Sequence, residues 1–389
     1  MRILILSFYY PPDLGPGSLR AKSLFDGLMN EMKNSLYIDL MTTSPNRYNT
    51  YSPSSPKIEK SKFSSIYRFN ITIYRNNLLC QSIAFFIYAW NVIKITRGKR
   101  YDLVLATTSR LMTGTLGAWV AKRSNAKFYL DLRDLFTDNL KNALNFFLIK
   151  FLIKFFKILE KWTFCSADKI NIISPGFLNY VKKVVPSKVL SVYTNGVDEE
   201  FIIKNHDNKK KNSFPLVLYV GTIGVSQGLH KLFSLMDNSW KKKAHFLFIG
   251  DGTKKKDLQK LISNKLWGNL KILNPMSRYE LLYHYKKADI LLLYLDNFES
   301  LDKVLPSKIF EYAATGKPIL AGVDGYAAKF LDENIDGVEI FKPCDIQNMK
   351  IAFLKLLKGP KNINRSSFCS TYSRKNIMKK MSKDILDLF

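Results

Sequence analysis

Apolar runs of strand length recur along the chain, separated by turn residues and helical stretches. Several are apolar on both faces, as is typical of parallel strands covered by helices. The predicted strands are Arg2–Leu6, Tyr37–Met41, Leu103–Ala106, Lys127–Leu132, Lys169–Ile173 and Val189–Val192, then Leu216–Val220, Ala244–Ile249, Leu270–Leu273, Ile290–Leu295, Pro318–Ala321 and Gly337–Phe341. The helices predicted between them include Leu19–Met32, Met112–Ser124, Lys254–Asn264, Arg278–Lys287 and Lys308–Thr315. This alternation predicts a layered α/β fold.

The alternation stops once, in the polar segment 199–214, and a new strand follows it. We therefore expect an N-terminal domain over 1–198, a linker over 199–214 and a C-terminal domain over 215–365, followed by a helix over 366–389. Because parallel sheets bind ligands at the carboxyl ends of their strands, we expect an active site in a cleft between the two domains.

The net charge of the chain is compatible with several classes of binding partner and does not distinguish between them. The 389 residues include 60 Lys and Arg against 32 Asp and Glu, a net charge of +28. Nucleic acid, an anionic membrane or a phosphate-bearing substrate would each attract such a chain, and solvated lysines are the plainer explanation. The four cysteines lack metal or disulfide spacing, and no signal peptide or bilayer-spanning run is evident. We expect a protein that works inside the cell.

Each half opens with a strand, a glycine-bearing loop and a helix. The first loop carries Gly15 and Gly17, and the second carries Gly221, Gly224 and Gly228. Glycines let the backbone approach a ligand closely, and a helix N-terminus offers N–H groups to an anion. Neither loop matches a dinucleotide-binding or Walker motif, so ordinary strand-to-helix turns remain the alternative.

The strongest local signal is LPSKIFEYAATGKPILAG at 305–322. Pro306 and Ser307 mark the start of a helix, and Glu311 lies one turn beyond Ser307 on the same face. A phosphate would contact Lys308, and Glu311 would accept hydrogen bonds from a ribose diol, because a carboxylate offers only acceptors. The alternative is that Lys308 and Glu311 form a surface pair.

This helix resembles the nucleotide-binding helix of family 4 retaining glycosyltransferases, which have the two-domain GT-B fold. The closer likeness is to bacterial members that add N-acetylhexosamine-type sugars in surface polysaccharide assembly. Nearly the whole chain takes part, through SFYYPPDLGPGSLR, YDLVLATTS, DLRDLFTD, ADKINIISPGF with NGVD, YVGTIGVSQGL, GDG and YSRKNIMKKMSKDILDLF. The resemblance implies an α/β fold of two Rossmann-like domains that face a central cleft.

The resemblance also implies roles for single residues. Glu311 would bind the ribose of a uridine-linked nucleotide sugar, and the first loop would close over the leaving group and seat the acceptor. The implied donor site comprises Gly221, Gly224, Gly228, Lys303, Ser307, Lys308 and Glu311; the implied acceptor and diphosphate loop comprises Gly15, Gly17, Arg20 and Arg133; the implied catalytic residues are Glu311, Lys308 and Asp134. Arg133 and Asp134 would face the cleft, with a structural ion pair as the alternative. No metal or other cofactor is expected, and the sugar would be transferred with retention.

Two departures from the wider family concern charge. Many members carry a second Glu eight residues before the ribose carboxylate, where this chain has Lys303. Many also carry Arg and Lys in the second glycine loop, where this chain has Ile223 and Gln227. Lys308, Lys303 and Arg20 are therefore the candidates for neutralising the diphosphate.

A basic apolar helix is predicted over 141–162, where one stripe carries Lys150, Lys154, Lys157 and Lys161. So wide an apolar face with a lysine edge favours a helix in a membrane interface. The alternative is a helix packed on the first domain with its lysines in solvent. A second apolar stretch, 78–100, ends in a basic cluster and is a candidate for the same surface.

Together these patterns predict a cytoplasmic glycosyltransferase, peripheral at the inner face of the cytoplasmic membrane. It would move a sugar from a UDP-sugar to a lipid-linked glycan in surface polysaccharide biosynthesis, such as O-antigen or capsule. A basic nucleic-acid-binding protein is the alternative from another class, although no nucleic-acid-binding motif is evident. A GT-B nucleotide-sugar epimerase is a further alternative. The sugar, the linkage and the oligomeric state do not follow from the sequence.

Overall fold

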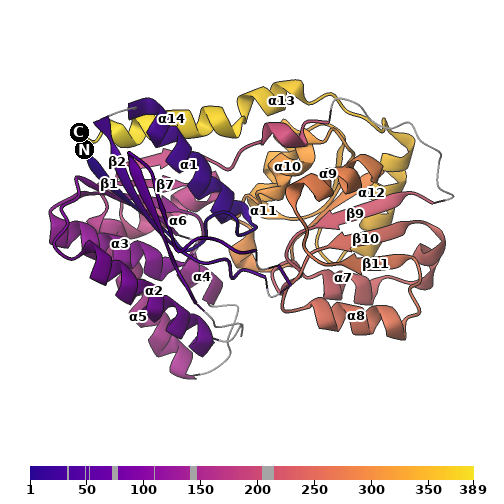
Figure 1. Ribbon diagram of the computed structural model, residues 1–389. Helices are drawn as coiled ribbons and strands as arrows, with labels where there is room; N and C mark the ends of the chain where they lie inside the picture. Colours follow the sequence, from indigo (N-terminus) through magenta and orange to yellow (C-terminus); the bar gives the residue numbers. More distant parts are fainter. Residues whose placement is uncertain are drawn as a thin grey trace. The chain divides into compact units, whose positions relative to one another are not determined.

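The chain divides into two compact units, each with its own sheet (Figure 1). The computed structural model describes residues 1–389 apart from 33–34, 49, 52, 72–77, 109, 141–146 and 204–213, and apart from the side chains of 78–79, 139–140 and 147–151. Unit 1 comprises Met1–Asn195 with Lys375–Phe389, and unit 2 comprises Gly196–Arg374. The polar segment 199–214, expected as a linker, therefore falls within unit 2, and most of it lies outside the described residues.

Unit 1 is built on an eight-stranded sheet in the order β3-β4-β2-β1-β5-β6-β7-β8. Neighbouring strands are parallel except β3, which is antiparallel to β4. The strands are β1 (Arg2–Ser7), β2 (Tyr37–Thr43), β3 (Ile58–Lys60), β4 (Ser64–Phe69), β5 (Leu103–Thr108), β6 (Lys127–Leu132), β7 (Lys169–Ile172) and β8 (Leu190–Val192). The central strands are buried on both faces, as their continuous apolar runs predict.

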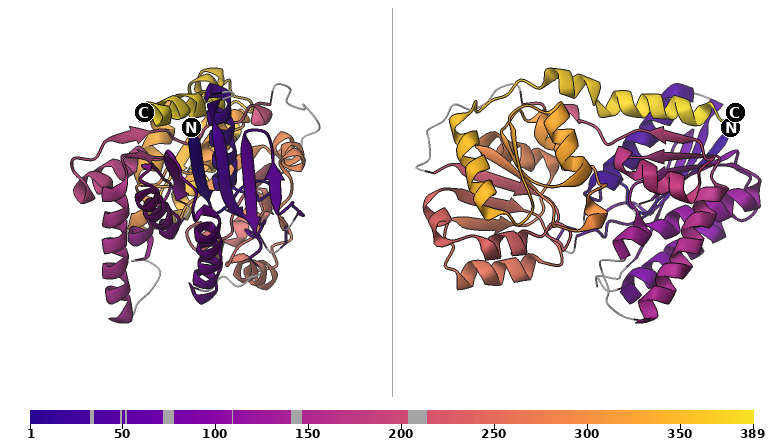
Figure 2. Two further views of the ribbon diagram at one scale, coloured as in Figure 1. Left: turned by 60° about the vertical axis from the view of Figure 1, so that its left-hand side comes forward. Right: turned by 180° about the vertical axis from the view of Figure 1, so that it is seen from behind.

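Helices cover both faces of this sheet. The helices of unit 1 are α1 (Pro16–Met32), α2 (Leu78–Thr96), α3 (Leu111–Ser124), α4 (Phe136–Leu140), α5 (Phe147–Ser166), α6 (Leu178–Val184) and α14 (Arg374–Leu386). Helices α1 and α14 pack on one face, where Leu24 and Met381 share a core with Ile5 and Leu105. Helices α2, α3 and α5 lie on the other face, and Figure 2 shows α2 and α5 projecting beyond the strands. The last helix in the chain thus completes the first unit.

Unit 2 contains a six-stranded parallel sheet in the order β11-β10-β9-β12-β13-β14. The strands are β9 (Leu216–Val220), β10 (His245–Ile249), β11 (Leu270–Leu273), β12 (Ile290–Tyr294), β13 (Ile319–Gly322) and β14 (Val338–Phe341). The helices are α7 (Leu229–Leu235), α8 (Lys255–Asn264), α9 (Arg278–Lys287), α10 (Lys308–Ala314), α11 (Gly325–Asn334), α12 (Ile346–Lys358) and α13 (Ser366–Thr371). The carboxyl ends of β9, β10 and β12 therefore share one edge of the sheet.

The predicted α/β alternation is confirmed, with two differences. Strands β3 and β4 were not predicted, because β3 is only three residues long and the β4 sequence SSIYRF mixes polar and apolar residues without a clear run. The segment 366–389, expected as one helix, forms two helices, α13 and α14, which belong to different units. Within the described residues, no helix is long and apolar enough to cross a membrane.

Candidate functional site

In unit 2 the glycine loop after β9 is held by backbone contacts with the loop after β10. The N–H of Gly221 donates to the carbonyl of Ile249 at 2.8 Å, and the N–H of Ile223 donates to the carbonyl of Asp251 at 2.8 Å. A side chain on Gly250 would collide with the Gly221 carbonyl, and one on Gly252 with the Ile223 carbonyl. Glycine is required here because two backbones touch directly. The GDG sequence thus shapes the second glycine loop.

Lys308, the first residue of α10, is placed beside this loop. Its Nζ donates a hydrogen bond of 2.6 Å to the hydroxyl of Tyr219, which donates in turn to the carbonyl of Thr222 at 2.6 Å. A side chain on Gly221, whose φ is +140°, would collide with the end of the Lys308 side chain. The loop and the lysine therefore come together, as expected. Tyr219 is fully buried and resembles an ordinary core residue in the sequence, so its positioning role was missed.

Glu311, one turn along α10, lies in a polar cluster of the same unit. The hydroxyl of the buried Tyr285 donates to its Oε1. Desolvation raises the pKa of Glu311, while the Tyr285 bond and the charges of Arg278 and Lys308 oppose that rise. Arg278 itself pairs with Asp198 at 2.7 Å. Lys308 and Glu311 are thus not an exposed surface pair, because each is partly buried and bonded to a tyrosine.

Gly224 and Gly228, the other glycines of the predicted donor site, lie in the same loop after β9. Gly228 has φ +55° at the start of α7, and a side chain there would come within 2.8 Å of Asp296, which pairs with Lys231 at 2.6 Å. The side chain of Gln227 folds back over Gly224, with Oε1 3.0 Å from where a Gly224 side chain would begin. These contacts fix the shape of the loop.

Ser307 and Lys303 are less firmly tied to this cluster. Ser307 precedes α10 but its side chain does not cap the helix, and it is partly exposed. Lys303 lies in the preceding turn, next to Asp302, whose pKa is raised by burial and by the charge of Asp324 while the charge of Lys303 opposes that rise. Their predicted contact with a ligand stays a prediction.

In unit 1 the first glycine loop lies against two arginines. A side chain on Gly17 would collide with the guanidinium of Arg133, at the end of β6, and one on Gly15 would come within 2.9 Å of Nε of Arg47. Asp13 holds the Arg47 segment in place by accepting the backbone N–H groups of Asn46 at 3.3 Å and Arg47 at 3.2 Å. Sequence reasoning missed Arg47 and Asp13, because their loops are adjacent only in the folded sheet.

Arg47 and Arg133 share an unusual state for cations. The Nε atom of each is buried and has no hydrogen-bond partner among the described residues. Arg47 stacks on the rings of Tyr9 and Tyr48, 5.5 Å from each centroid. Neither arginine appears in an ion pair within the described part of the chain, so the alternative of an Arg133–Asp134 pair is not observed; Asp134 is exposed. Two buried donors beside a glycine loop suit an anionic ligand.

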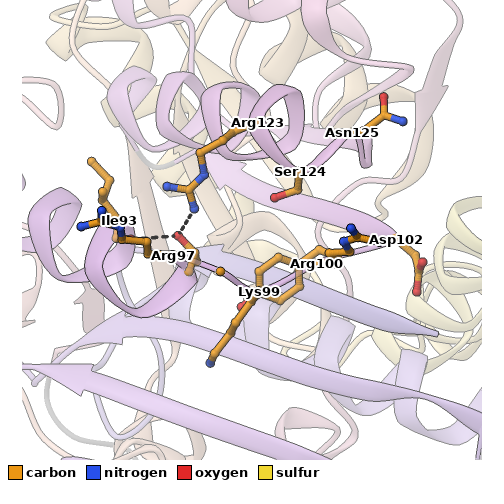
Figure 3. A pocket seen from close by; sticks show the side chains of 11 residues that line it. Ile93, Arg97, Lys99, Arg100, Asp102, Arg123, Ser124 and Asn125 are labelled. Atoms are coloured by element: carbon orange, nitrogen blue, oxygen red, sulfur yellow. Dashed lines mark hydrogen bonds between the residues drawn. The ribbon is translucent and has the colours of Figure 1, made fainter.

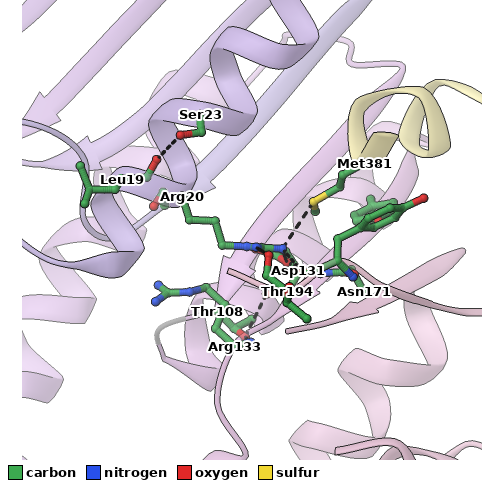
Figure 4. A network of polar contacts seen from close by, with 12 residues as sticks. Leu19, Arg20, Ser23, Thr108, Asp131, Arg133, Asn171, Thr194 and Met381 are labelled. Carbon is green, nitrogen blue, oxygen red and sulfur yellow. Dashed lines mark hydrogen bonds and ion pairs between the residues drawn. The ribbon is translucent and has the colours of Figure 1, made fainter. Parts of the chain in front are cut away.

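Arg20 corrects the sequence prediction. It was expected to face a diphosphate, but its side chain is fully buried in unit 1 and bonded on several sides (Figure 4). It pairs with Asp131 through two hydrogen bonds of 2.8 Å and donates to the carbonyls of Tyr193 and Thr194 at 2.8 Å. Nε, NH1 and NH2 are all engaged, so Arg20 is a structural residue that joins α1 to β6.

Helix α5 covers the described part of the basic apolar helix predicted over 141–162 and extends to Ser166, while 141–146 lie outside the described residues. Lys154, Lys157 and Lys161 are exposed, and so are Leu152, Phe155 and Ile158. The opposite face packs on the unit, where the buried Glu160 accepts hydrogen bonds of 2.6 Å from Thr137 and Tyr180. The side chain of Lys150 lies outside the described residues. The helix is therefore packed on one face and leaves a mixed basic and apolar face in solvent.

Metal-binding side chains do not gather at any point in the described ranges. No three of the His, Cys, Asp and Glu residues there are grouped so as to hold a metal ion.

The fold, and part of the sequence, are similar to those of known proteins. Residues 200–375 match the family model Glycosyl transferases group 1, and this match covers nearly all of unit 2. The structure superposes on WaaG, a glycosyltransferase involved in lipopolysaccharide biosynthesis, with a TM-score of 0.70 and 13% identity over 98% of this chain and 99% of that one. The chain has the GT-B fold. The Anabaena protein HepE, solved with UDP-glucose, superposes with a TM-score of 0.66 and 14% identity over the full length of both chains.

Curated relatives are similar over shorter stretches. Sulfoquinovosyl transferase SQD2 of Arabidopsis thaliana is 29% identical over 136 residues, 34% of this chain and 25% of that protein. WcaI of Escherichia coli K12, named as a colanic acid biosynthesis glycosyl transferase, is 25% identical over 183 residues, 46% of this chain and 44% of that protein. The chain thus spans less than half the length of these two relatives. The Lys308–Glu311 cluster lies inside residues 200–375, the part of the chain that matches the glycosyltransferase group 1 model.

Proposed function

We propose that the protein is a retaining glycosyltransferase of family 4 that takes its sugar from a UDP-sugar. The observation that carries this proposal is the α10 cluster, in which Lys308 lies against the glycine loop and Glu311 lies one turn further along the helix. Both lie in the group 1 domain, at the edge of the sheet where parallel strands bind ligands.

In this proposal the two α10 side chains divide the donor between them. The Glu311 carboxylate accepts hydrogen bonds from the two ribose hydroxyls, with Tyr285 holding its other side. The Lys308 ammonium and the backbone N–H groups of the loop that begins at Gly221 neutralise the diphosphate. No metal is required for that role, because the cation and the oriented amides stabilise the charge of the leaving group.

The transfer then proceeds on one face of the sugar. The acceptor hydroxyl attacks the anomeric carbon as the bond from that carbon to the diphosphate oxygen breaks. UDP leaves on the same face, and a phosphate oxygen takes the proton of the attacking hydroxyl. The products are UDP and a glycan extended by one sugar of retained configuration. In unit 1, the acceptor is bound by the loop from Gly15 to Gly17 with Arg133, to which we add Arg47.

We propose a lipid-linked glycan of bacterial surface polysaccharide as the acceptor, and an N-acetylhexosamine-type sugar as the donated group. The resemblance of the chain to that bacterial subgroup supports both, as do the names of WcaI and WaaG, which refer to colanic acid and lipopolysaccharide biosynthesis. HepE was solved with UDP-glucose, which supports a uridine-linked donor. The exposed lysines of α5 support a peripheral position at the inner face of the cytoplasmic membrane.

Replacing the ribose-binding carboxylate tests the proposal. Glu311→Gln should weaken UDP binding by at least about 100-fold, because two hydrogen bonds to a charged acceptor each contribute roughly 1.5–3 kcal/mol. Titration calorimetry with UDP measures this loss, and thermal unfolding checks that the variant is folded. Glu333→Gln, at an exposed glutamate on α11, is the matched control and should bind UDP normally. Equal UDP affinity in the two variants contradicts the ribose assignment.

The pH dependence of UDP binding gives a second test of the same carboxylate. Binding requires the ionised form of Glu311, and burial raises the pKa of that group. Affinity should therefore fall as the pH drops through the raised pKa, at a higher pH than an ordinary glutamate would show. The Glu311→Gln variant should lose this acid-side dependence. A wild-type affinity that does not change across this range would argue against the role.

A GT-B epimerase is distinguished by its need for an acceptor. An epimerase would convert its nucleotide sugar without one, whereas the proposed transferase needs the acceptor for efficient UDP release. The group 1 match favours the transferase.

A further inference from the structure

The outer face of helix α2 carries an aromatic stripe that no other part of the described chain covers. Ile83 is 51% exposed, and Phe86 and Trp90 are each 72% exposed. These residues are spaced at i, i+3 and i+7 and so lie along one face of the helix. On the neighbouring helix α3, Trp119 is 41% exposed. A contiguous set of large apolar side chains in water marks a contact surface.

Both helices end at a basic pocket of about 850 Å³ (Figure 3). Its lining includes four cations, Arg97, Lys99, Arg100 and Arg123, and one carboxylate, Asp102. The carboxylate Oδ2 of Asp102 accepts the backbone N–H of Arg2 at 2.6 Å. Positive charge therefore dominates the pocket.

The arginines of the pocket are not neutralised by neighbouring carboxylates. Lys99 approaches the buried Asp39 at 3.6 Å, but no ion pair between described residues includes Arg97, Arg100 or Arg123. Arg123 is oriented by a hydrogen bond of 2.8 Å to the Thr96 hydroxyl. Clustering like charges is unfavourable unless an anion binds among them, so the pocket suits a phosphate group.

The stripe and the pocket are continuous. The α2 face that carries Ile83, Phe86 and Trp90 continues through the exposed Lys94, at i+11 from Ile83, and Arg97 follows directly after the last residue of the helix. On α3, the guanidinium of Arg123 lies 4.7 Å from the ring centroid of Trp119, one turn earlier. Aromatic side chains next to cations match a bilayer interface, where rings enter the acyl boundary and cations meet headgroup phosphates.

We propose that this surface, the α2 stripe with its pocket, docks on a bilayer and binds the phosphate of an anionic phospholipid. The proposal deepens the membrane association proposed above and adds a lipid site separate from the α5 lysines. Charge complementarity selects the anionic lipid. A soluble phosphate compound would neutralise the pocket but leave Phe86 and Trp90 in water, and so would leave the stripe without a partner.

Vesicle cosedimentation tests the proposal. The full-length protein should bind vesicles of phosphatidylcholine with phosphatidylglycerol and bind vesicles of phosphatidylcholine alone much more weakly. The pocket variant Arg97→Gln/Arg100→Gln/Arg123→Gln should lose about 100-fold in affinity for the anionic vesicles, because each basic residue near the surface contributes about fivefold. Trp90→Ala should lose about tenfold. Thermal unfolding confirms that each variant is folded.

The matched control removes the same charge from the opposite face of the same unit. Lys379, Lys380 and Lys383 are exposed on α14, and their triple change to Gln should leave vesicle binding unchanged within about twofold. Equal losses in the pocket and α14 variants would overturn the proposal, since net charge alone would then explain binding. The proposal would also be overturned if glycerol 3-phosphate bound the protein as tightly as the anionic vesicles do and displaced it from them. The pocket would then be assigned to a soluble ligand.

UDP titration separates this inference from the proposed function. The pocket variant should bind UDP as the wild type does, because the UDP site is assigned to unit 2. If the wild type does not bind UDP but the pocket variant alone loses vesicle binding, the proposed donor fails and the lipid site stands. If it binds UDP but neither the pocket nor Trp90 affects vesicle binding, the lipid site fails alone.

Discussion

The two glycine loops of this protein follow one plan but are held in place by different means. In unit 2, the loop after β9 is fixed by backbone pairing with the loop after β10, at Gly221 with Ile249 and Ile223 with Asp251. In unit 1, the loop after β1 lies against the side chains of Arg47 and Arg133. One loop depends on contacts between main chains, and the other on charged side chains from distant parts of the sequence.

This difference determines what a nearby cation does. In unit 2, Lys308 is partly buried and reaches its loop through Tyr219, so it stays beside the glycine loop. In unit 1, Arg20 follows its loop by three residues but turns inward to Asp131. A basic residue close to a glycine loop is therefore not sufficient to indicate a ligand contact. The direction of its side chain depends on whether a buried acid is present beneath it.

The largest effect expected from this comparison is on the stability of unit 1. Arg20→Met should lower the free energy of unfolding by about 3–5 kcal/mol, because it leaves Asp131 buried without its partner. Chemical denaturation measures the loss. The double variant Arg20→Met/Asp131→Leu should recover most of it, since no unpaired charge then remains. Lys22→Met, which breaks an exposed pair with Asp26, is the control and should cost less than about 1 kcal/mol.

The same variants test the corrected role of Arg20. If Arg20→Met kept full stability but bound UDP more weakly, Arg20 would be a ligand contact after all. The difference between the two loops would then disappear.

A second effect concerns Asp13, which orders the arginine-bearing loop of unit 1. Burial raises the pKa of Asp13 to about 6, against the opposing hydrogen bonds from Asn46 and Arg47. The folded state thus holds the proton more tightly than the unfolded state, so stability should fall as the pH rises from about 4 to about 6, by up to about 3 kcal/mol.

Denaturation of the wild type and of Asp13→Asn across this range checks the prediction. The variant should lack this component of the pH dependence, because its amide does not ionise. Parallel pH profiles in the two proteins would show that Asp13 does not titrate as its burial predicts.

A smaller effect is expected from adding a methyl group to the loop of unit 2. Gly221→Ala places a side chain against the end of Lys308 and strains a backbone with φ +140°. Lys308 is flexible and moves aside, so the fold survives while UDP affinity falls about tenfold, the value of one charge-assisted hydrogen bond. Calorimetry measures this loss. In a Lys308→Ala background the glycine change should add much less, which a purely structural role of Gly221 would not produce.

The smallest effect is expected from the equivalent glycine-to-alanine change in the loop of unit 1. Gly17→Ala directs its methyl group at the Arg133 guanidinium but has no unusual φ to strain. The arginine shifts, so the KM for the acceptor should rise a few-fold while UDP affinity stays constant. A change in UDP affinity instead would assign the loop of unit 1 to the donor. Comparing Gly17→Ala with Gly221→Ala in one assay separates the two loops by ligand.

Much of the fold could be predicted because its signals are local. Strands that are buried on both faces, such as β5 and β12, appear in the sequence as continuous apolar runs, and Pro306 with Gly316 marked the ends of α10 closely. The exposed face of α5 also followed from its own spacing. Strands β3 and β4 were not predicted, because they lie at and next to the edge of the sheet and carry polar residues.

The candidate site was predicted in part for the same reason. Lys308, Glu311 and the second glycine loop share short motifs, whereas the tyrosines that position them are indistinguishable from core residues in the sequence. Arg20 was assigned wrongly because Asp131 lies 111 residues away along the chain. A pattern of neighbouring residues carries no information about a contact between residues so far apart in the sequence. It becomes visible only when β6 is placed beside the helix that follows β1.

Helix α14 has a consequence for how the protein is made. Residues 375–389 belong to unit 1, where Met381 contacts Arg20 and Asp384 pairs with Lys169. The ribosome releases these residues only after all of unit 2 has been translated. Unit 2 is thus free to finish folding first, while the earlier-made unit waits with part of its core uncovered. During synthesis, a chaperone would find its binding surface on the older half of the nascent chain.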